Sequence, residues 1–385
     1  MLEGRDIVCV GFSDWDKDLR TNEQHLLTRL ARHNRVLYIE SLGVRRPQLA
    51  ARDLRRIARR LVKGLRPLRT IDGVHVLSPL VLPLHHRAWA RRLNAALLPR
   101  VVLWAVRRLG FSDLLLWAFM PQAEVLLAPL APAQVLYYVD DDHAAKKGID
   151  GPTFRAAEER FVAAADVVLA SAPELVERMR ALHADVHYAP SVADTELFAR
   201  ALQPGPADAA IDALARPRIV FVGAIVANKL DLELIAQLTR LRPDWSFAFV
   251  GPVGPGDPGT NVDLLRHLPN VRMLGHRPYE ALPDVLRGAD VAIMPYRTNG
   301  EMRSVFPMKT YEYLAAGVPV VTTPLPALAS VEEVVKAADA AEMAARIDDA
   351  LAADTPQARA ARSAAAQSHS WEARLEQLAA VLARG

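Results

Sequence analysis

The segment FPMKTYEYLAAGVPVVTTP (306–324) places a cation and a carboxylate on one turn of a short helix. Lys309 and Glu312 are three residues apart, a spacing at which helical side chains share a face. A carboxylate can accept two hydrogen bonds from a ribose diol, and an ammonium group neutralises phosphate. The pair therefore has the chemistry to hold a nucleotide, although an exposed Lys–Glu pair on a plain crossover helix has the same spacing.

The residues around this pair set the ends of the helix. Pro307 suits the first turn, because its missing N–H and fixed φ cost nothing there. Gly317 suits the left-handed residue that ends a helix, and Pro319 prevents continuation. We therefore expect a helix over 308–316. Its N-terminal amides would carry partial positive charge and be free to bind phosphate.

A second polar cluster follows the strand-like run QVLYYVD (134–140) and consists of Asp140, Asp141, Asp142 and His143. Ligands of parallel sheets bind at the carboxyl ends of the strands. The cluster is therefore a candidate catalytic or acceptor-binding site, and a polar loop or helix cap is the alternative. A metal–diphosphate site at the two outer aspartates would suit a fold with one nucleotide-binding domain, which would leave the second half of the chain unexplained.

A predicted helix start near the N-terminus adds three candidates. Thr21 and Gln24 have the spacing of a capping box. In a two-domain fold this helix start would face the ligand cleft beside Trp15, Asn22 and His25. We predict that these three residues bind an acceptor, with a core or surface role as the alternative for His25.

The elements that must position these residues form two series of near-continuous apolar runs, which are typical of parallel strands covered on both faces. The first series comprises residues 6–12, 35–41, 74–79, 114–120, 134–140, 166–172 and 185–190. The second comprises residues 218–224, 246–254, 271–275, 290–296 and 318–323. Between them lies a segment rich in proline, glycine and small residues (201–217), which we interpret as a linker.

This pattern predicts an α/β protein with two Rossmann-like, doubly wound domains that face each other across a cleft. The predicted acceptor-binding domain is 1–200, the linker is 201–217, and the nucleotide-binding domain is 218–365. Residues 366–385 form an amphipathic helix that could pack on either domain.

Composition agrees with a soluble two-domain protein, since 385 residues exceed one typical core. The single cysteine, Cys9, excludes an intramolecular disulfide and lies in an apolar run, as expected for a core residue in a reducing compartment. The start MLEGRDIVCV lacks the features of a signal peptide, and no apolar run approaches the ~18 residues of a membrane span. We expect a cytoplasmic protein.

Two segments concentrate basic residues. Residues 45–69 contain ten basic residues and one acid, and residues 87–110 contain six basic residues and no acid. Both mix arginines with apolar residues at helical spacing. They are either solvated helix faces or surfaces that dock on an anionic membrane or acceptor. Nucleic acid is the least favoured partner, because no recognised binding module accompanies the charge.

Several other motifs are excluded. DWDKD (14–18) resembles the start of a calcium loop, but Leu19 replaces the required glycine and His25 the bidentate glutamate. The sequence contains no Cys/His cluster typical of zinc, no G-x-S-x-G of a hydrolase and no G-x-G-x-x-G of a nicotinamide enzyme.

The segment PMKTYEYLAAGVPVVTT resembles the nucleotide-sugar motif of retaining glycosyltransferases of the two-domain GT-B fold, glycosyltransferase family 4 in particular. The subset with the pattern P-x-K-x-Y/F-E-Y-L-A-A-G, which includes teichuronic-acid transferases, is the most similar. RIVFVGAIVANKLDLELI, PDWSFAFVGPVG and the terminal HSWEARLEQL also match. The likeness covers nearly the whole chain.

The resemblance implies a donor site. Its residues would be Gly223, Lys229, Gly251, Arg277, Tyr279, Arg303, Ser304, Lys309, Thr310 and Glu312. Glu312 would hold the ribose of the donor, and Lys229 the diphosphate. Ala224 replaces an arginine of the family, so Lys309 or Arg303 would have to supply the missing charge. Ser304 stands where the family often has an acidic residue.

The resemblance also implies a reaction, in which a sugar passes with retention from a UDP, GDP or dTDP donor to an acceptor hydroxyl. Lys229, Asp141 and His143 are the catalytic candidates. Because the leaving phosphate oxygen can take the acceptor proton, no protein base is obligatory, and we expect no metal cofactor. A nucleotide-sugar epimerase of the same fold and a non-catalytic scaffold are the alternatives.

Overall fold

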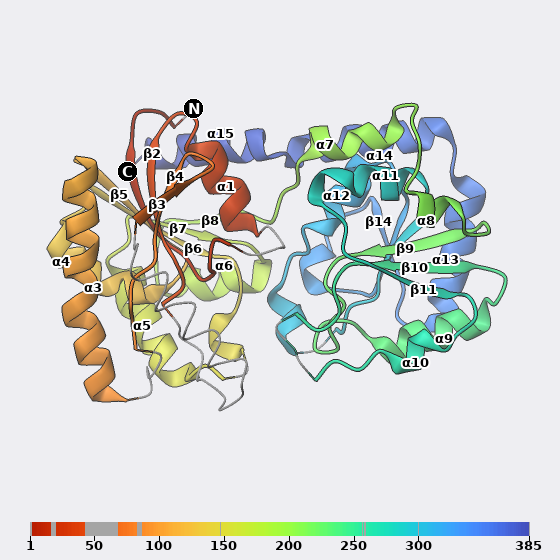
Figure 1. The fold of residues 1–385 in the computed structure, drawn as a ribbon, viewed down its shortest axis with the longest axis horizontal. Helices are drawn as coiled ribbons and strands as arrows, with labels where there is room; N and C mark the ends of the chain where they lie inside the picture. Colours follow the sequence, from red (N-terminus) through yellow and green to blue (C-terminus); the bar gives the residue numbers. More distant parts are fainter. Residues whose placement is uncertain are drawn as a thin grey trace. The chain divides into compact units, whose positions relative to one another are not determined.

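The computed structural model describes residues 2–16, 21–42, 68–82, 87–146, 148–255, 257, 259–298 and 300–384. Contacts within the chain divide it into two compact units. The first unit comprises Met1–Pro190 and Leu375–Gly385, and the second comprises Ser191–Arg374. Each unit has its own sheet with helices along both sides (Figure 1). The predicted α/β class with two parallel-sheet domains is therefore confirmed.

The sheet of the first unit has the strand order β3-β4-β2-β1-β5-β6-β7-β8 among the described residues. Its strands are β1 (Asp6–Val10), β2 (Arg35–Ile39), β3 (Leu68–Ile71), β4 (Val74–Leu77), β5 (Leu114–Ala118), β6 (Gln134–Val139), β7 (Val167–Ala170) and β8 (Val186–Tyr188). The pairings are parallel except for β3 with β4, which form a hairpin at one edge. β1 and β5 are buried along their whole length, which explains their apolar composition.

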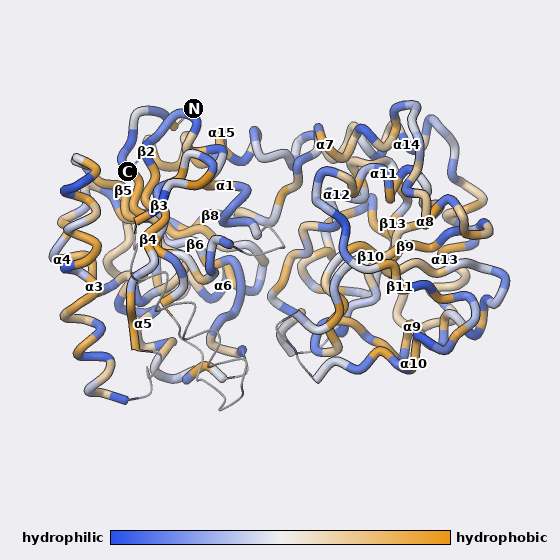
Figure 2. The backbone as a smooth tube through the Cα atoms, in the orientation of Figure 1, coloured by the Kyte–Doolittle hydropathy of each residue, from blue (hydrophilic) through white to orange (hydrophobic). Residues whose placement is uncertain are grey.

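The helices of the first unit connect these strands. They are α1 (Asn22–Leu30), α3 (Ala88–Leu109), α4 (Leu127–Leu130), α5 (Gly151–Ala163) and α6 (Pro173–Arg180), with the 3₁₀ turns η1 (Pro121–Leu126) and η2 (His143–Ala145). The predicted capping box at the start of α1 is confirmed, since the Thr21 amide donates to Gln24 Oε1 at 2.9 Å. Apolar residues concentrate on the strands of each unit (Figure 2).

The sheet of the second unit has the order β11-β10-β9-β12-β13-β14, with parallel pairings between its described strands. The strands are β9 (Arg218–Val222), β10 (Ser246–Val250), β11 (Val271–Gly275), β12 (Val291–Met294), β13 (Val320–Thr322) and β14 (Val334–Lys336). The order reverses direction between β9 and β12, so this is a doubly wound sheet with a switch point, where such sheets bind ligands.

The helices of the second unit flank this sheet. They are α7 (Thr195–Ala199), α8 (Ala209–Asp212), α9 (Leu232–Leu241), α10 (Asp263–Arg266), α11 (Leu282–Arg287), α12 (Lys309–Ala315), α13 (Ala340–Ala353), α14 (Pro356–Ala366) and the start of α15 (Trp371–Leu382). The 3₁₀ turns are η3 (Arg200–Leu202), η4 (Tyr279–Ala281), η5 (Gly300–Ser304), η6 (Pro326–Leu328) and η7 (Gln367–His369).

The boundary between the units lies at residue 190, earlier than the predicted residue 200. The reason is a contact between distant segments. Ala193 forms a parallel β-bridge with Ser370, and Thr195 Oγ1 donates to Gln367 Oε1 at 3.0 Å. Residues 191–200 therefore belong to the second unit.

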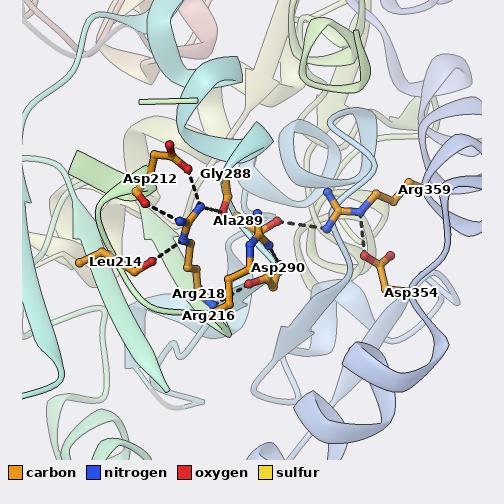
Figure 3. Close-up of polar contacts among 9 residues, drawn as sticks. All are labelled: Asp212, Leu214, Arg216, Arg218, Gly288, Ala289, Asp290, Asp354 and Arg359. Atoms are coloured by element: carbon orange, nitrogen blue, oxygen red, sulfur yellow. Dashed lines mark hydrogen bonds and ion pairs between the residues drawn. The ribbon is translucent and has the colours of Figure 1, made fainter. Parts of the chain in front are cut away.

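The predicted linker 201–217 is also packed against the second unit rather than extended (Figure 3). The buried guanidinium of Arg218 donates to Leu214 O at 2.8 Å and to Asp212 Oδ1 at 3.1 Å. Arg216 pairs with Asp290, which also accepts from the Arg218 amide at 2.7 Å. Proline, glycine and small residues correctly indicate irregular backbone here, but they do not reveal these ion pairs.

The C-terminal helix α15 crosses the boundary, because its residues from Leu375 belong to the first unit. In that unit Gln134 Nε2 donates to Leu382 O, and Gln377 Nε2 donates to Tyr188 O, both at 3.0 Å. No helix in the described part of the chain is both long and apolar enough to span a membrane. Most of the basic segment 45–69 lies outside the described residues.

Candidate functional site

Three glycines leave the carboxyl ends of adjacent strands in the second unit without side chains. Gly223 and Gly251 directly follow β9 and β10, and Gly275 ends β11. The Gly223 amide donates to Val250 O at 2.7 Å, and the Gly251 amide donates to Gly275 O at 2.8 Å. At Gly251, where φ is +147°, a Cβ would lie 2.0 Å from Gly223 O. Only glycine fits there, so the backbone at the end of β10 packs directly on the backbone at the end of β9.

The Lys309 side chain extends over Gly223. A Cβ on Gly223 would fall 2.1 Å from Lys309 Cε and 2.6 Å from Lys309 Nζ. The ammonium group therefore lies directly above the end of β9. Tyr313 fixes the helix in this position, because its hydroxyl accepts from the Val222 amide at 2.8 Å and donates to Val222 O at 3.1 Å. Sequence reasoning missed Tyr313, whose role depends on a strand 91 residues away.

The predicted helix over 308–316 is observed as α12, Lys309–Ala315. The prediction that its first amides are free for phosphate is wrong for Thr310 and Tyr311. The amides of Thr310, Tyr311 and Glu312 donate to the carbonyls of Pro307 and Met308 at 3.1–3.3 Å. Lys309 adds a full positive charge at this position.

Glu312 lies one turn after Lys309 and is 6% exposed. Tyr279, which packs edge-to-face on Phe198, donates its hydroxyl to Glu312 Oε1 over a long 3.5 Å. Burial raises the pKa of Glu312, while Lys309 and the Tyr279 hydroxyl oppose that rise. The residue is thus a shielded carboxylate with a cation beside it, which suits the binding of hydroxyl groups next to a phosphate.

Lys229 belongs to a loop that is anchored on two sides. On one side Ile225 forms a β-bridge with Val253, and on the other Leu230 forms a bridge with Tyr296. The Arg297 amide donates to Lys229 O at 2.7 Å, and Arg297 Nε donates to Ala227 O at 2.9 Å. The backbone of Lys229 is therefore held at the carboxyl edge of the same sheet.

Arg297 is a basic residue at this edge that the sequence analysis missed. It follows β12, and its side chain lies on the loop that also carries Lys229. A usable signal was present, since an arginine directly after the apolar run 290–296 must lie at a strand's carboxyl end.

Other predicted donor residues are placed differently. The side chain of Thr310 is fully buried and contacts Met294 Sδ at 3.9 Å, so it belongs to the core. Arg277 forms an ion pair with Asp208, with Nε and Oδ2 2.7 Å apart, and this pair fastens the chain before α8. Ser304 is buried and Arg303 exposed, both on η5.

In the first unit, the cluster after β6 is closed on itself. His143 Nε2 lies 3.0 Å from Asp140 Oδ1, and Lys146 Nζ lies 3.0 Å from His143 Nδ1. Because an ammonium group can only donate, Nδ1 accepts and Nε2 donates. Lys146 also pairs with Asp141 at 2.6 Å. Both ring nitrogens of this buried histidine hydrogen-bond to neighbouring side chains, so the predicted catalytic role of His143 stays a prediction.

The remaining acceptor candidates also make structural contacts. Arg155 Nη2 donates to both carboxylate oxygens of Asp142, at 2.7 Å to Oδ1 and 2.6 Å to Oδ2. Trp15 is 4% exposed and packs on Tyr38, and His25 is 2% exposed. Asn22, by contrast, is half-buried at the start of α1. Trp15 and His25 are therefore buried within the first unit, and Asn22 is the most exposed of the three predicted acceptor-binding residues near this helix start.

A buried carboxylate that the sequence analysis did not single out lies close by. Glu23 is fully buried and accepts hydrogen bonds from the Phe12 amide at 2.7 Å and from the Ser13 and Tyr38 hydroxyls at 2.9 Å. Burial, followed by the charge of Asp140, raises the pKa of Glu23 to about 7. Glu23 therefore ties the loop after β1 to α1.

The described part of the first unit contains a cavity of about 330 Å³, between α3, η1 and α5. None of the predicted acceptor residues lines it. In the described ranges no group of three or more His, Cys, Asp or Glu side chains is arranged to hold a metal ion.

Comparison with known proteins agrees with the geometry of the second unit. Residues 216–353 match the family described as Glycosyl transferases group 1. The matched segment contains β9 to β14 and α12, and hence Gly223, Lys229, Lys309 and Glu312.

Sequence similarity extends to one named bacterial protein. The chain is 30% identical over 232 residues to TuaH of Bacillus subtilis (strain 168), which is named as a teichuronic acid biosynthesis glycosyltransferase. The match covers 57% of this chain and 57% of TuaH, so the chain spans little more than half the length of this relative.

Solved structures resemble the whole chain. Sucrose-phosphate synthase from Thermosynechococcus elongatus has a TM-score of 0.68 at 16% identity, with 99% of this chain and 98% of that chain covered. Anabaena HepE in complex with UDP and glucose has a TM-score of 0.65 at 15% identity, with coverages of 98% and 99%. Trehalose 6-phosphate synthase from Burkholderia multivorans has a TM-score of 0.67 at 14% identity, with coverages of 100% and 99%. The GT-B fold is therefore confirmed.

Proposed function

We propose that this chain is a glycosyltransferase that moves a sugar, with retention, from a nucleotide diphosphate-sugar to an acceptor hydroxyl. The observation that carries the proposal is the placement of the Lys309 ammonium above Gly223, one helical turn from the shielded carboxylate of Glu312. A cation above a residue without a side chain suits a diphosphate, and a carboxylate next to it suits a ribose diol. The group 1 match of residues 216–353 supports the same reading.

In the proposed reaction, the bond between the sugar C1 and the leaving diphosphate breaks, and a bond from C1 to the acceptor oxygen forms. The acceptor proton passes to the leaving phosphate oxygen, so the protein need not supply a base. Lys229 and Lys309 would stabilise the negative charge that grows on the diphosphate. Since these cations can neutralise it, we expect full activity in the presence of EDTA.

The donor nucleotide is proposed to be UDP, GDP or dTDP. HepE, which shares the fold, has been solved with UDP-glucose. An epimerase is less favoured, because it would need carboxylates and a free histidine, whereas His143 makes contacts with Asp140 and Lys146 through both ring nitrogens. For the acceptor we propose a hydroxyl compound held at an anionic membrane, with peripheral association of the protein.

The first test is thermal stabilisation by UDP, GDP, dTDP, ADP and CMP. A ligand at ~100 times its Kd raises the free energy of unfolding by about 2.7 kcal/mol. We expect one nucleotide to raise Tm and the variant Glu312→Ala to abolish the shift. The control variant is Glu233→Ala, an exposed glutamate on α9, which should retain the shift. A shift that persists in Glu312→Ala would contradict the assigned site.

A further inference from the structure

The long helix α3 exposes large apolar side chains on its outer face. Trp89 is 57% exposed, Leu93 42%, Leu97 43% and Trp104 46%. In Figure 1 this helix runs along the outer edge of the first unit, and Figure 2 shows apolar and polar residues interleaved along it. Exposed tryptophan carries a high cost in water, so an uncovered face of this kind indicates a surface that binds something.

The four side chains share one side of the helix. At 3.6 residues per turn they fall within an arc of about 80°, and Trp89 and Trp104 are ~22 Å apart along the axis. The opposite side carries buried residues of the helix, including Leu98, Val102 and Ala105. α3 therefore has one apolar side packed into the first unit and a second apolar side that no described residue covers.

The charge on this helix has a single sign. Arg91, Arg92, Arg100, Arg107 and Arg108 are exposed, and residues 88–109 contain no Asp or Glu. On the same helical wheel, Arg100 and Arg107 fall at the edge of the apolar arc or within it. The partner of this face must therefore accept tryptophan and leucine side chains and be negatively charged.

We propose that the face formed by Trp89, Leu93, Leu97, Arg100 and Trp104, with Arg107 and Arg108 at its end, docks on an anionic lipid bilayer. Tryptophan side chains prefer the boundary between headgroups and acyl chains, and arginines at the same depth pair with lipid phosphates. A bilayer also needs no shape complementarity, which suits the single convex face of a helix. Nucleic acid would meet the charge but would leave the leucines in water.

Docking itself does not depend on the proposed function, but its consequence does. If the chain transfers a sugar, docking through the first unit would present the protein to acceptors that are carried in the membrane. The sequence left two interpretations of the basic segment 87–110 open, a solvated helix face and a membrane-binding surface. Docking through α3 would make it a membrane-binding surface.

The experiment is flotation of the whole chain with vesicles of phosphatidylcholine, with and without phosphatidylglycerol. The wild-type chain should float only with the anionic lipid, and high salt should release it. Trp89→Ser with Trp104→Ser should lower the vesicle-bound fraction about tenfold or more. Arg107→Gln with Arg108→Gln should weaken binding by about fivefold for each arginine, as expected for ~1 kcal/mol per charge.

Matched controls come from the same unit. Leu182 is exposed to a similar extent (42%) on another part of the surface, and Leu182→Ser should bind like wild type. Arg32 and Arg180 are exposed arginines outside α3, and Arg32→Gln with Arg180→Gln should also bind like wild type. All variants change exposed side chains, so their Tm values should match that of the wild-type chain.

A second readout is quenching of tryptophan fluorescence by brominated acyl chains, which should disappear in the Trp89→Ser, Trp104→Ser variant. Three results would overturn the proposal: no flotation, flotation without dependence on anionic lipid, or equal binding by the α3 variants and their controls. The nucleotide-induced rise in Tm, measured on the same samples, separates this proposal from the proposed function, because it should be unchanged in every α3 variant.

Discussion

The carboxyl edges of the two sheets are built in opposite ways. In the second unit, Gly223 and Gly251 have no side chains, and Lys309 extends over Gly223. In the first unit, polar side chains gather at the corresponding edge, but they bind one another, as His143 does with Asp140 and Lys146. A cluster of charged residues is thus weaker evidence for a ligand site than a gap in side chains with a cation beside it.

The largest expected effect tests the carboxyl edge of the second unit's sheet, at Gly223 and Lys309, which we call the open edge. Glu312→Ala and Lys229→Ala should each lower kcat/KM for glycosyl transfer by about a hundredfold to a thousandfold, because each removes a group that stabilises or positions the donor. Steady-state turnover with the nucleotide-sugar selected by thermal shift measures the effect, and circular dichroism checks the fold. Near-normal turnover in both variants would remove the functional distinction between the two edges.

The second prediction concerns the carboxyl edge of the first unit's sheet, which we call the closed edge. It describes how the stability of the chain depends on pH through Glu23. The pKa of Glu23 is raised by burial from 4.5 to about 7. Between these values the folded chain binds more protons than the unfolded chain, so Glu23 makes stability fall as pH rises from about 4.5 to 7. The ionised side chain then costs about 3 kcal/mol above pH 7.

Glu23→Gln should remove this dependence, because the amide does not ionise. Urea unfolding of both chains at several pH values measures their free energies of unfolding. The value for the variant should increase relative to that of wild type as pH rises. Parallel curves for the two chains would show that folding does not raise the pKa of Glu23.

The third prediction separates structure from chemistry within the aspartate–histidine cluster. His143→Ala removes a buried ring that packs between Phe12 and Phe154 and leaves Asp140 and Lys146 without it. We expect the free energy of unfolding to fall by about 2 kcal/mol, with the nucleotide-induced rise in Tm retained. Unchanged stability with lost turnover would instead make the first unit's edge a catalytic site, as the sequence pattern suggested.

How far the sequence predicts this molecule depends on the range of the interactions. α12 was predicted to within a residue at each end, because Pro307 and Gly317 act locally; Gly317 has φ of +74° and ends the helix. The capping box at Thr21 is local as well. The strands followed from continuous apolar runs, but the short edge strands β3 and β14 did not, since a partly exposed strand has no such run.

Long-range partners could not be predicted from one sequence. Arg277 was expected in the donor site, but it forms an ion pair with Asp208, 69 residues away. Tyr313 appeared to be an ordinary helix residue until its hydroxyl was found on Val222. In the polar cluster the residue types were correct, yet a sequence does not show whether carboxylates and cations satisfy one another or remain available to a ligand.

The smallest predicted effect tests whether Arg297 also contributes to donor binding at the open edge. Arg297→Ala should raise KM for the donor about tenfold with little change in kcat, because the guanidinium adds charge next to Lys229 without contacting the reacting atoms. Arg297→Lys should recover part of the loss, since it keeps the charge but not the bond from Nε to Ala227 O. Arg272→Ala, an exposed arginine on β11, is the control. If Arg297→Ala and the control have equal KM values, Arg297 only tethers the loop, and the cations of the open edge are the two lysines.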